Sequence, residues 1–136
     1  MKPSETLRRL ALRARRNAYA PYSGVKIGAA LRMKDGSVFT GCNVENASYG
    51  GTVCAERVAI FKAVSEGAKG PVVEICVASD AAEPWPPCGL CRQVLAEFAT
   101  PDTLVVTVNP KKATETFRFG DLFPAAFTPS YLKRRK

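Results

Sequence analysis

The sequence predicts an α/β protein, a three-layer α/β/α sandwich with a mixed central sheet of about five strands. The first observation is the order of helical and strand patterns along the chain, α-β-β-α-β-α-β-β. Such an order is typical of a sheet covered by helices on both faces. The second is the length of 136 residues without an internal repeat or linker, which fits a single domain over residues 1–136.

The first predicted element is an amphipathic helix near the N-terminus. Ser4 can cap its start, and Pro21 ends the pattern. Arginines separate apolar residues that recur at helical spacing. These apolar residues are Leu7, Leu10, Ala11, Ala14 and Ala18.

Two strands follow, over residues 25–33 and 37–42, and the Asp35-Gly36 pair between them is a strong hairpin signal. Residues 43–52 are rich in Asn, Ser and Gly and predict a loop. Loops on a rigid scaffold are where binding residues gather.

The second half of the chain continues the alternation. A mostly apolar segment over residues 53–66 predicts a buried helix that ends at Gly67. A short buried strand over residues 72–78 leads into a loop with several prolines, residues 80–87. The last predicted elements are a helix at 89–99, strands at 104–108 and 116–119, and a helical turn at 121–127.

Composition narrows the function classes. Five cysteines, an odd number, with no secretory segment predict a reducing, cytoplasmic location with free or metal-bound thiols. No apolar run is long enough for a membrane span, so we expect a soluble protein. The chain has no histidine, so proton transfer near neutral pH must use a carboxylate, a thiol or metal-bound water.

The net charge of +8 is concentrated at the two ends of the chain, in residues 2–16 and 133–136. A basic patch can hold nucleic acid by neutralising phosphates. These clusters lack the interleaved aromatic residues of a single-strand groove. We therefore expect solvated surface charge, with nucleic acid an unlikely partner.

Two short stretches carry the chemistry, Cys54-Ala55-Glu56 and Pro87-Cys88-Gly89-Leu90-Cys91, each at the head of a predicted helix. Three thiolates leave one position of a tetrahedral zinc ion open for water, which is the catalytic arrangement. Glu56 then supplies an acid and base beside that water. A ligand, a glutamate two residues later and Pro-Cys-x-x-Cys together form the pattern of zinc nucleobase deaminases.

Other interpretations of the cysteines remain open at this point. The Cys88–Cys91 pair alone fits a redox dithiol or half of a structural zinc site. A structural site needs a fourth ligand, for which Cys42 and Cys76 are the remaining thiols. Cys76 lies within an apolar strand, where a free cysteine is most often a core residue.

Two arginines adjoin the candidate ligands. Arg57 and Arg92 are expected to offset the negative charge of three thiolates by donating hydrogen bonds to sulfur. The alternative is that each is an ordinary surface arginine.

Together these residues resemble the small, homotetrameric, zinc-dependent cytidine deaminases of pyrimidine salvage. The resemblance covers most of the chain. It implies that the protein hydrolyses cytidine and 2'-deoxycytidine to uridine and 2'-deoxyuridine, releasing ammonia and using one Zn²⁺ per subunit. The segments that carry it are residues 20–23, 28–31, 41–50, 54–57, 87–93 and 123–127.

The resemblance also implies a role for each site residue. Cys54, Cys88 and Cys91 would bind zinc, and Glu56 would move the protons. Asn43 and Glu45 would bind the ribose, and Ala55 would bind the cytosine edge together with Glu56. The residues that would reach the site of a neighbouring subunit are Ala47, Tyr49 and Phe127. The residues that would surround the ligands are Arg57, Arg92 and Gln93.

Two positions depart from the family pattern. Val25 stands where a phenylalanine that stacks on the pyrimidine is common, and Gly51 replaces a larger apolar residue. Stacking of a base on an aromatic side chain is worth about 1–3 kcal/mol. Val25 is therefore expected to weaken cytidine binding or to admit a differently shaped base, and a modified cytosine nucleoside such as blasticidin S is the alternative substrate.

Overall fold

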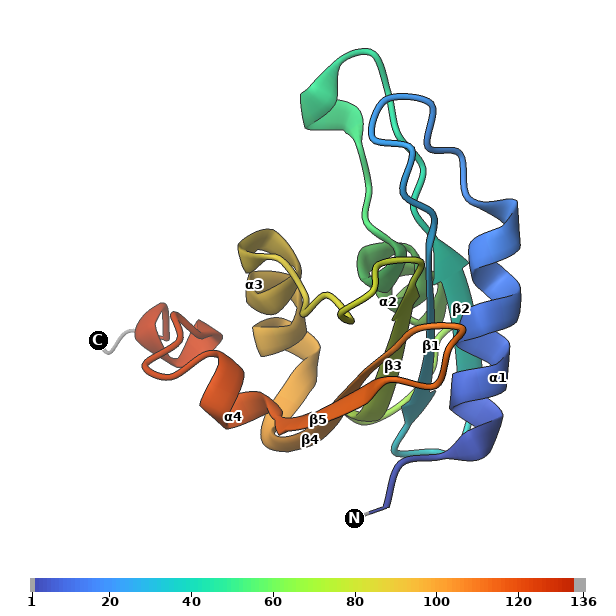
Figure 1. Cartoon of the computed structure of the whole chain (residues 1–136). Helices are drawn as coiled ribbons and strands as arrows, with labels where there is room; N and C mark the ends of the chain where they lie inside the picture. Colours follow the sequence, from blue (N-terminus) through green and yellow to red (C-terminus); the bar gives the residue numbers. More distant parts are fainter. Residues whose placement is uncertain (1, 134–136) are drawn as a thin grey trace.

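A mixed sheet runs through the molecule in the strand order β2-β1-β3-β4-β5 (Figure 1). The computed structural model describes residues 2–133, so the basic residues 134–136 lie outside the description. Strands β3 and β4 are parallel, and the other neighbouring pairs are antiparallel. The strands are β1 (Ile27–Met33), β2 (Val38–Cys42), β3 (Val72–Ser79), β4 (Ala99–Val108) and β5 (Thr114–Arg118).

Helices cover both faces of this sheet, which confirms the predicted three layers. Helix α1 (Glu5–Ala14) packs on one face, while α2 (Ala55–Ser65) and α3 (Gly89–Phe98) pack on the other (Figure 1). A short helix, α4 (Phe119–Leu122), follows β5. Single 3-10 turns occur at Arg15–Asn17, Tyr49–Gly51 and Pro129–Tyr131.

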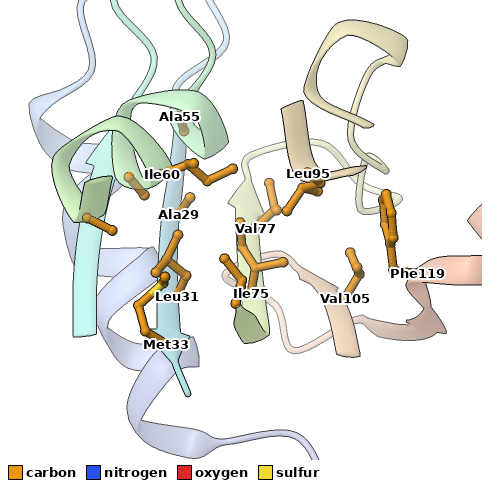
Figure 2. Close-up of a cluster of buried hydrophobic side chains, with 13 residues drawn as sticks. Ala29, Leu31, Met33, Ala55, Ile60, Ile75, Val77, Leu95, Val105 and Phe119 are labelled. Carbon is orange, nitrogen blue, oxygen red and sulfur yellow. The ribbon is translucent and has the colours of Figure 1, made fainter. Parts of the chain in front are cut away.

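The central strands bury both faces, because their alternate residues enter two different cores. In β3, Ile75 and Val77 belong to the core under α2 and α3, whereas Cys76 and Ala78 belong to the core under α1. Figure 2 shows the larger core, where Leu95 of α3 packs with the side chains of the sheet. Burial on both faces explains why this strand is almost continuously apolar.

Two glycines let the helices lie directly on the sheet. A Cβ atom at Gly28 would stand 2.1 Å from the carbonyl oxygen of Ala11 in α1. A Cβ atom at Gly41 would stand 2.6 Å from the carbonyl oxygen of Ala55 in α2. The contact at Gly41 therefore sets the position of the first turn of α2 against the sheet.

The local signals in the sequence were accurate in the first half of the chain. The backbone N–H of Leu7 donates to Ser4 Oγ at 3.2 Å, so Ser4 caps α1 as predicted. Gly36 has φ +91° in the predicted hairpin turn. Within residues 2–133, no helix is both long and apolar enough to span a membrane.

The last strands start earlier than predicted. Strand β4 begins at Ala99, immediately after α3, because Ala99 pairs with Val72 of β3. Strand β5 begins at Thr114, which pairs with Val108. The start of β4 depends on pairing with a strand distant in the sequence, which local sequence patterns do not record.

Candidate active site

Three thiols meet where α2 and α3 begin. Cys54 is the N-cap residue of α2, Cys88 is the N-cap residue of α3, and Cys91 lies in the first turn of α3. Their sulfur atoms all lie within 4.8 Å of one another, and the Cys54–Cys88 sulfurs are 3.9 Å apart. A tetrahedral zinc ion with Zn–S bonds of about 2.3 Å needs sulfurs about 3.8 Å apart. The thiols therefore fit zinc.

The cluster contains three cysteines and no fourth ligand among residues 2–133. Cys76 is buried in the core under α1, on the face of the sheet that α2 and α3 do not cover. Cys42 also stands outside the cluster. A site closed by four sulfurs therefore does not form in this part of the chain, and all five cysteines are free thiols.

The surroundings of the cluster favour the thiolate form of Cys54. The hydrogen bond with Cys91, followed by the contact with Arg57, lowers the pKa of Cys54 to about 5. The same hydrogen bond, together with burial, raises the pKa of Cys91. Both helix N-termini add positive potential at the sulfurs. Cys54 is therefore the first of this pair to give up its proton.

Arg57 lies against the cluster as predicted. One terminal guanidinium nitrogen donates to Cys54 Sγ at 3.3 Å and lies 3.5 Å from the carbonyl oxygen of Thr52. Its Nε is buried and has no hydrogen-bond partner within residues 2–133. A positive group in this position offsets part of the charge that three thiolates would bring to a metal.

Glu56 lies beside the thiols but is not part of their cluster. Its side chain is only 4% exposed in the first turn of α2. Burial, followed by the charge of Cys54, raises the pKa of Glu56 to about 7. A carboxyl group with such a pKa can both accept and return a proton near neutral pH.

A cavity of about 240 Å³ opens over this carboxyl group. Half of its lining consists of residues that the sequence analysis selected, namely Val25, Asn43, Glu45, Cys54, Glu56 and Cys88. The other half was missed and consists of Ser23, Ile27, Thr52, Val77, Trp85 and Pro86. The structure therefore brings two of the three cysteines, the acid and the two predicted ribose-binding residues to one cavity, whereas Cys91 lies buried behind its lining.

Asn43 and Glu45 form several hydrogen bonds with other residues of the same chain. Asn43 Oδ1 accepts from the backbone N–H of Ile27 at 2.9 Å, and its Nδ2 donates to the carbonyl of Val25 at 2.9 Å. Glu45 accepts from the backbone N–H groups of Tyr22 and Ser23 and from the Ser23 hydroxyl. These bonds hold the cavity wall in place and lower the pKa of Glu45.

The three residues predicted to reach a neighbouring subunit lie away from the cavity of the chain that carries them. Ala47 and Tyr49 are exposed on a loop that projects beyond the sheet (Figure 1). The ring of Tyr49 lies edge-on to that of Tyr22, with the two ring centroids 6.1 Å apart. Phe127 is 54% exposed and stacks on Tyr131 at 5.5 Å. These residues are absent from the cavity lining of the same chain.

Arg92 contacts different groups from those predicted. Its Nε donates to the carbonyl of Pro87 at 2.8 Å, and one terminal nitrogen donates to the carbonyl of Leu122 at 2.7 Å, instead of to a cysteine sulfur. One residue after Cys91 on a helix is about 100° around its axis, so the side chain leaves the cluster. Gln93 likewise donates to the carbonyl of Phe127 at 2.9 Å. Both residues tie α3 to the C-terminal segment.

The basic face of α1 lies apart from this site. Three arginines of α1 and two of the 3-10 turn that follows it, together with residues that include Glu5 and Pro110, border an open hollow of about 1060 Å³. One of them, Arg15, is paired with Asp80 at 2.7 Å. The hollow shares no residue with the thiol cluster or its cavity. Its position does not connect the basic charge with the chemistry of the thiols.

Comparison with known proteins identifies the family. A family model described as "Cytidine and deoxycytidylate deaminase zinc-binding region" matches residues 1–107. The chain belongs to this deaminase family. The residues matched include the three thiols and Glu56.

Individual members of the deaminase family resemble most of the chain. A cytidine deaminase of Halalkalibacterium halodurans is 53% identical over 118 residues, which cover 87% of this chain and 89% of that protein. A cytidine deaminase of Mycobacterium tuberculosis is 40% identical over 131 residues, covering 96% and 93%. The crystal structure of a cytidine deaminase from Burkholderia pseudomallei matches with a TM-score of 0.87 at 46% identity, covering 93% of this chain and 100% of that one.

Proposed function

We propose that the protein catalyses the hydrolytic deamination of cytidine and 2'-deoxycytidine to uridine and 2'-deoxyuridine, with release of ammonia, in pyrimidine salvage. The observation that carries this proposal is the group of three close sulfurs beside a buried glutamate that is not one of the ligands. Membership of the deaminase family supports it. One domain over residues 1–136, in a reducing cytoplasm, would suffice for this reaction.

Cys54, Cys88 and Cys91 would hold one zinc ion. When bound there, zinc supplies an activated water and an electrophilic centre. Arg57 donates to Cys54 Sγ and keeps that thiolate in place. The helix N-termini that carry the sulfurs favour the deprotonated ligands that a metal requires.

Glu56 would move the protons. Its carboxylate accepts a proton from the attacking water and delivers one to N3 of the cytosine ring. It then carries a proton to the departing amino group, which leaves as ammonia. Burial of Glu56 keeps bulk water from competing for these protons.

The sugar and the base would be held by the cavity wall. Glu45 retains acceptor capacity for a ribose hydroxyl beyond the three hydrogen bonds it accepts from residues 22 and 23. Asn43 retains one amide hydrogen for the same purpose. The backbone of Ala55, at the start of α2, would bind the cytosine edge together with Glu56.

The enzyme would act as a homotetramer whose sites are completed by neighbouring subunits. Tyr49 is 77% exposed and Phe127 is 54% exposed, although both are aromatic. Ala47 lies on the same projecting loop as Tyr49. Such exposed apolar residues favour burial against a second copy.

The direct test is to incubate the zinc-loaded protein with cytidine and to measure both uridine and ammonia. Equal amounts of the two products are expected. Deoxycytidine and blasticidin S, assayed in parallel, define the substrate. Failure to release ammonia from every cytosine nucleoside would end the proposal.

A further inference from the structure

Trp85 contributes an aromatic ring to the cavity. Its side chain lines the cavity together with Glu56 and is 46% exposed. The other apolar residues of the lining, Val25, Ile27 and Val77 among them, are aliphatic. Within the described residues, Trp85 is therefore the one aromatic ring in the wall of this cavity.

The loop that carries Trp85 is held firmly at both ends. Asn109 Nδ2 donates to the carbonyls of Ala81 and Ala82 at 3.1 and 2.8 Å. Pro84 and Pro87, on either side of Trp85, are buried. The ring is thus half exposed although its backbone is anchored. A fixed aromatic face at the edge of a cavity is a ready surface for a flat ligand.

We propose that Trp85 is the residue on which the cytosine ring of the substrate stacks, and that it determines the preference for a flat pyrimidine base. This inference rests on the proposed function, because it assigns the contact that holds the base at the same site. Val25, in the same lining, offers an aliphatic contact but no aromatic face. Among the described residues of the chain that forms the cavity, the aromatic contact with the base therefore falls to Trp85.

The chain offers a direct reporter for this contact, because Trp85 is its only tryptophan. The zinc-loaded Glu56→Gln variant, which is expected to bind cytidine without turning it over at an appreciable rate, is titrated with cytidine while tryptophan emission is recorded. Saturable quenching is expected, because stacking changes the surroundings of the indole. Titration with ribose, which has no base, is the matched control and should leave the emission unchanged.

Two substitutions separate stacking from simple filling of space. Trp85→Phe keeps a flat aromatic face, whereas Trp85→Leu keeps an apolar side chain without one. We expect Trp85→Leu to raise KM for cytidine about 5- to 140-fold, the range that corresponds to the loss of one base–aromatic stack. Trp85→Phe should recover most of this loss, and kcat should change much less than KM in both.

The possible outcomes distinguish a failure of the role of Trp85 from a failure of the proposed function. Equal KM values for the two variants, or emission that does not respond to cytidine while the parent protein turns cytidine over, would overturn the role of Trp85 and leave the proposed function standing. Dissociation of the oligomer in Trp85→Leu without a change in KM would assign the ring to a contact between subunits instead, and would also overturn the inference. A parent protein without cytidine turnover would remove the proposed function itself.

Discussion

The molecule buries two glutamates on opposite sides of its fold. Glu56, beside the thiols, is 4% exposed, and Glu74, in β3, is 1% exposed. Glu74 accepts from the backbone N–H of Ser4 at 2.8 Å and pairs with Arg32 at 3.3 Å. Glu56 has no salt-bridge partner among the described residues, and burial raises its pKa to about 7.

Burial alone therefore does not decide what a carboxyl group does. Glu74 is fixed by donors from Ser4, the N-cap residue of α1, and from Arg32 of β1, so its charge joins the start of α1 to the sheet. Glu56 forms no salt bridge among the described residues and borders a cavity, so its proton remains exchangeable. A buried acid with few partners in a cavity is a candidate for proton transfer, whereas a paired one is a candidate for stability.

The largest effect is expected at Glu56. Glu56→Gln keeps the shape of the side chain but removes proton transfer, so kcat for cytidine should fall by about 10²- to 10⁴-fold. The zinc content should stay at one ion per chain, because Glu56 is not part of the sulfur cluster. Steady-state kinetics and metal analysis on the same sample provide the check; a variant that loses its zinc would make Glu56 a ligand instead.

Arg57, beside the thiols, and Arg32, beside Glu74, give a second comparison between the two sides of the fold. Arg57→Gln should weaken zinc binding about 10- to 100-fold, because the guanidinium donates to Cys54 Sγ. Arg32→Gln is the control, since Arg32 pairs with Glu74 and not with a thiol. Competition with a zinc chelator measures both affinities. If the two substitutions weaken zinc equally, the contact of Arg57 with sulfur has no special part in holding the metal.

Glu74→Gln should act on stability. The amide cannot accept at both positions, so the buried side chain keeps only one of its two donors, and the free energy of unfolding should fall by about 1–2 kcal/mol. Denaturant unfolding of the zinc-loaded protein measures this loss. Because Glu74 lies outside the cavity lining, kcat per folded molecule should be unchanged. A large drop in kcat at full folding would contradict the division between the two acids.

The smallest effect is expected at Cys76, two residues after Glu74 in β3. Burial, followed by the charge of Glu74, raises the pKa of Cys76 from 9.0 to about 12. The folded state therefore holds this proton where the unfolded state has released it, and stability falls as the pH rises from 9 towards 12. Between pH 8 and 10 the contribution to the fall is about 1.4 kcal/mol.

Urea unfolding at several pH values tests whether the free energy of unfolding falls as the pH rises. Cys76→Ala should show a flatter decline of stability above pH 8 than the parent protein. If the variant follows the parent, the thiol of Cys76 does not titrate between the folded and unfolded states as the burial implies.

The sequence predicted those parts that depend on local chemistry. The cap at Ser4 and the hairpin turn at Gly36 were correct because each requires only a few neighbouring residues. The convergence of Cys54 with Cys88 and Cys91 was predicted because both helix starts carry short motifs of fixed spacing. The division of the sheet into two buried faces followed from the order of its elements.

What the sequence missed depends on contacts between distant segments. The start of β4 at Ala99 is set by pairing with Val72, not by any turn residue. Arg92 was assigned to sulfur from its place beside Cys91, but its direction around the helix takes it to the carbonyl of Leu122. Trp85 had only one signal, its position in the loop between a buried strand and a ligand pair. Ligands gather at such strand ends in α/β sheets.

The thiol cluster joins segments that a ribosome makes at different times. Cys54 leaves the ribosome well before Cys88 and Cys91, and the three come together only after β3 has entered the sheet and α3 has docked. A growing chain that stops before residue 91 can offer an ion at most two of these sulfurs. The complete set of three sulfurs therefore requires both helix starts, from segments more than thirty residues apart in the sequence, to be packed on the same sheet.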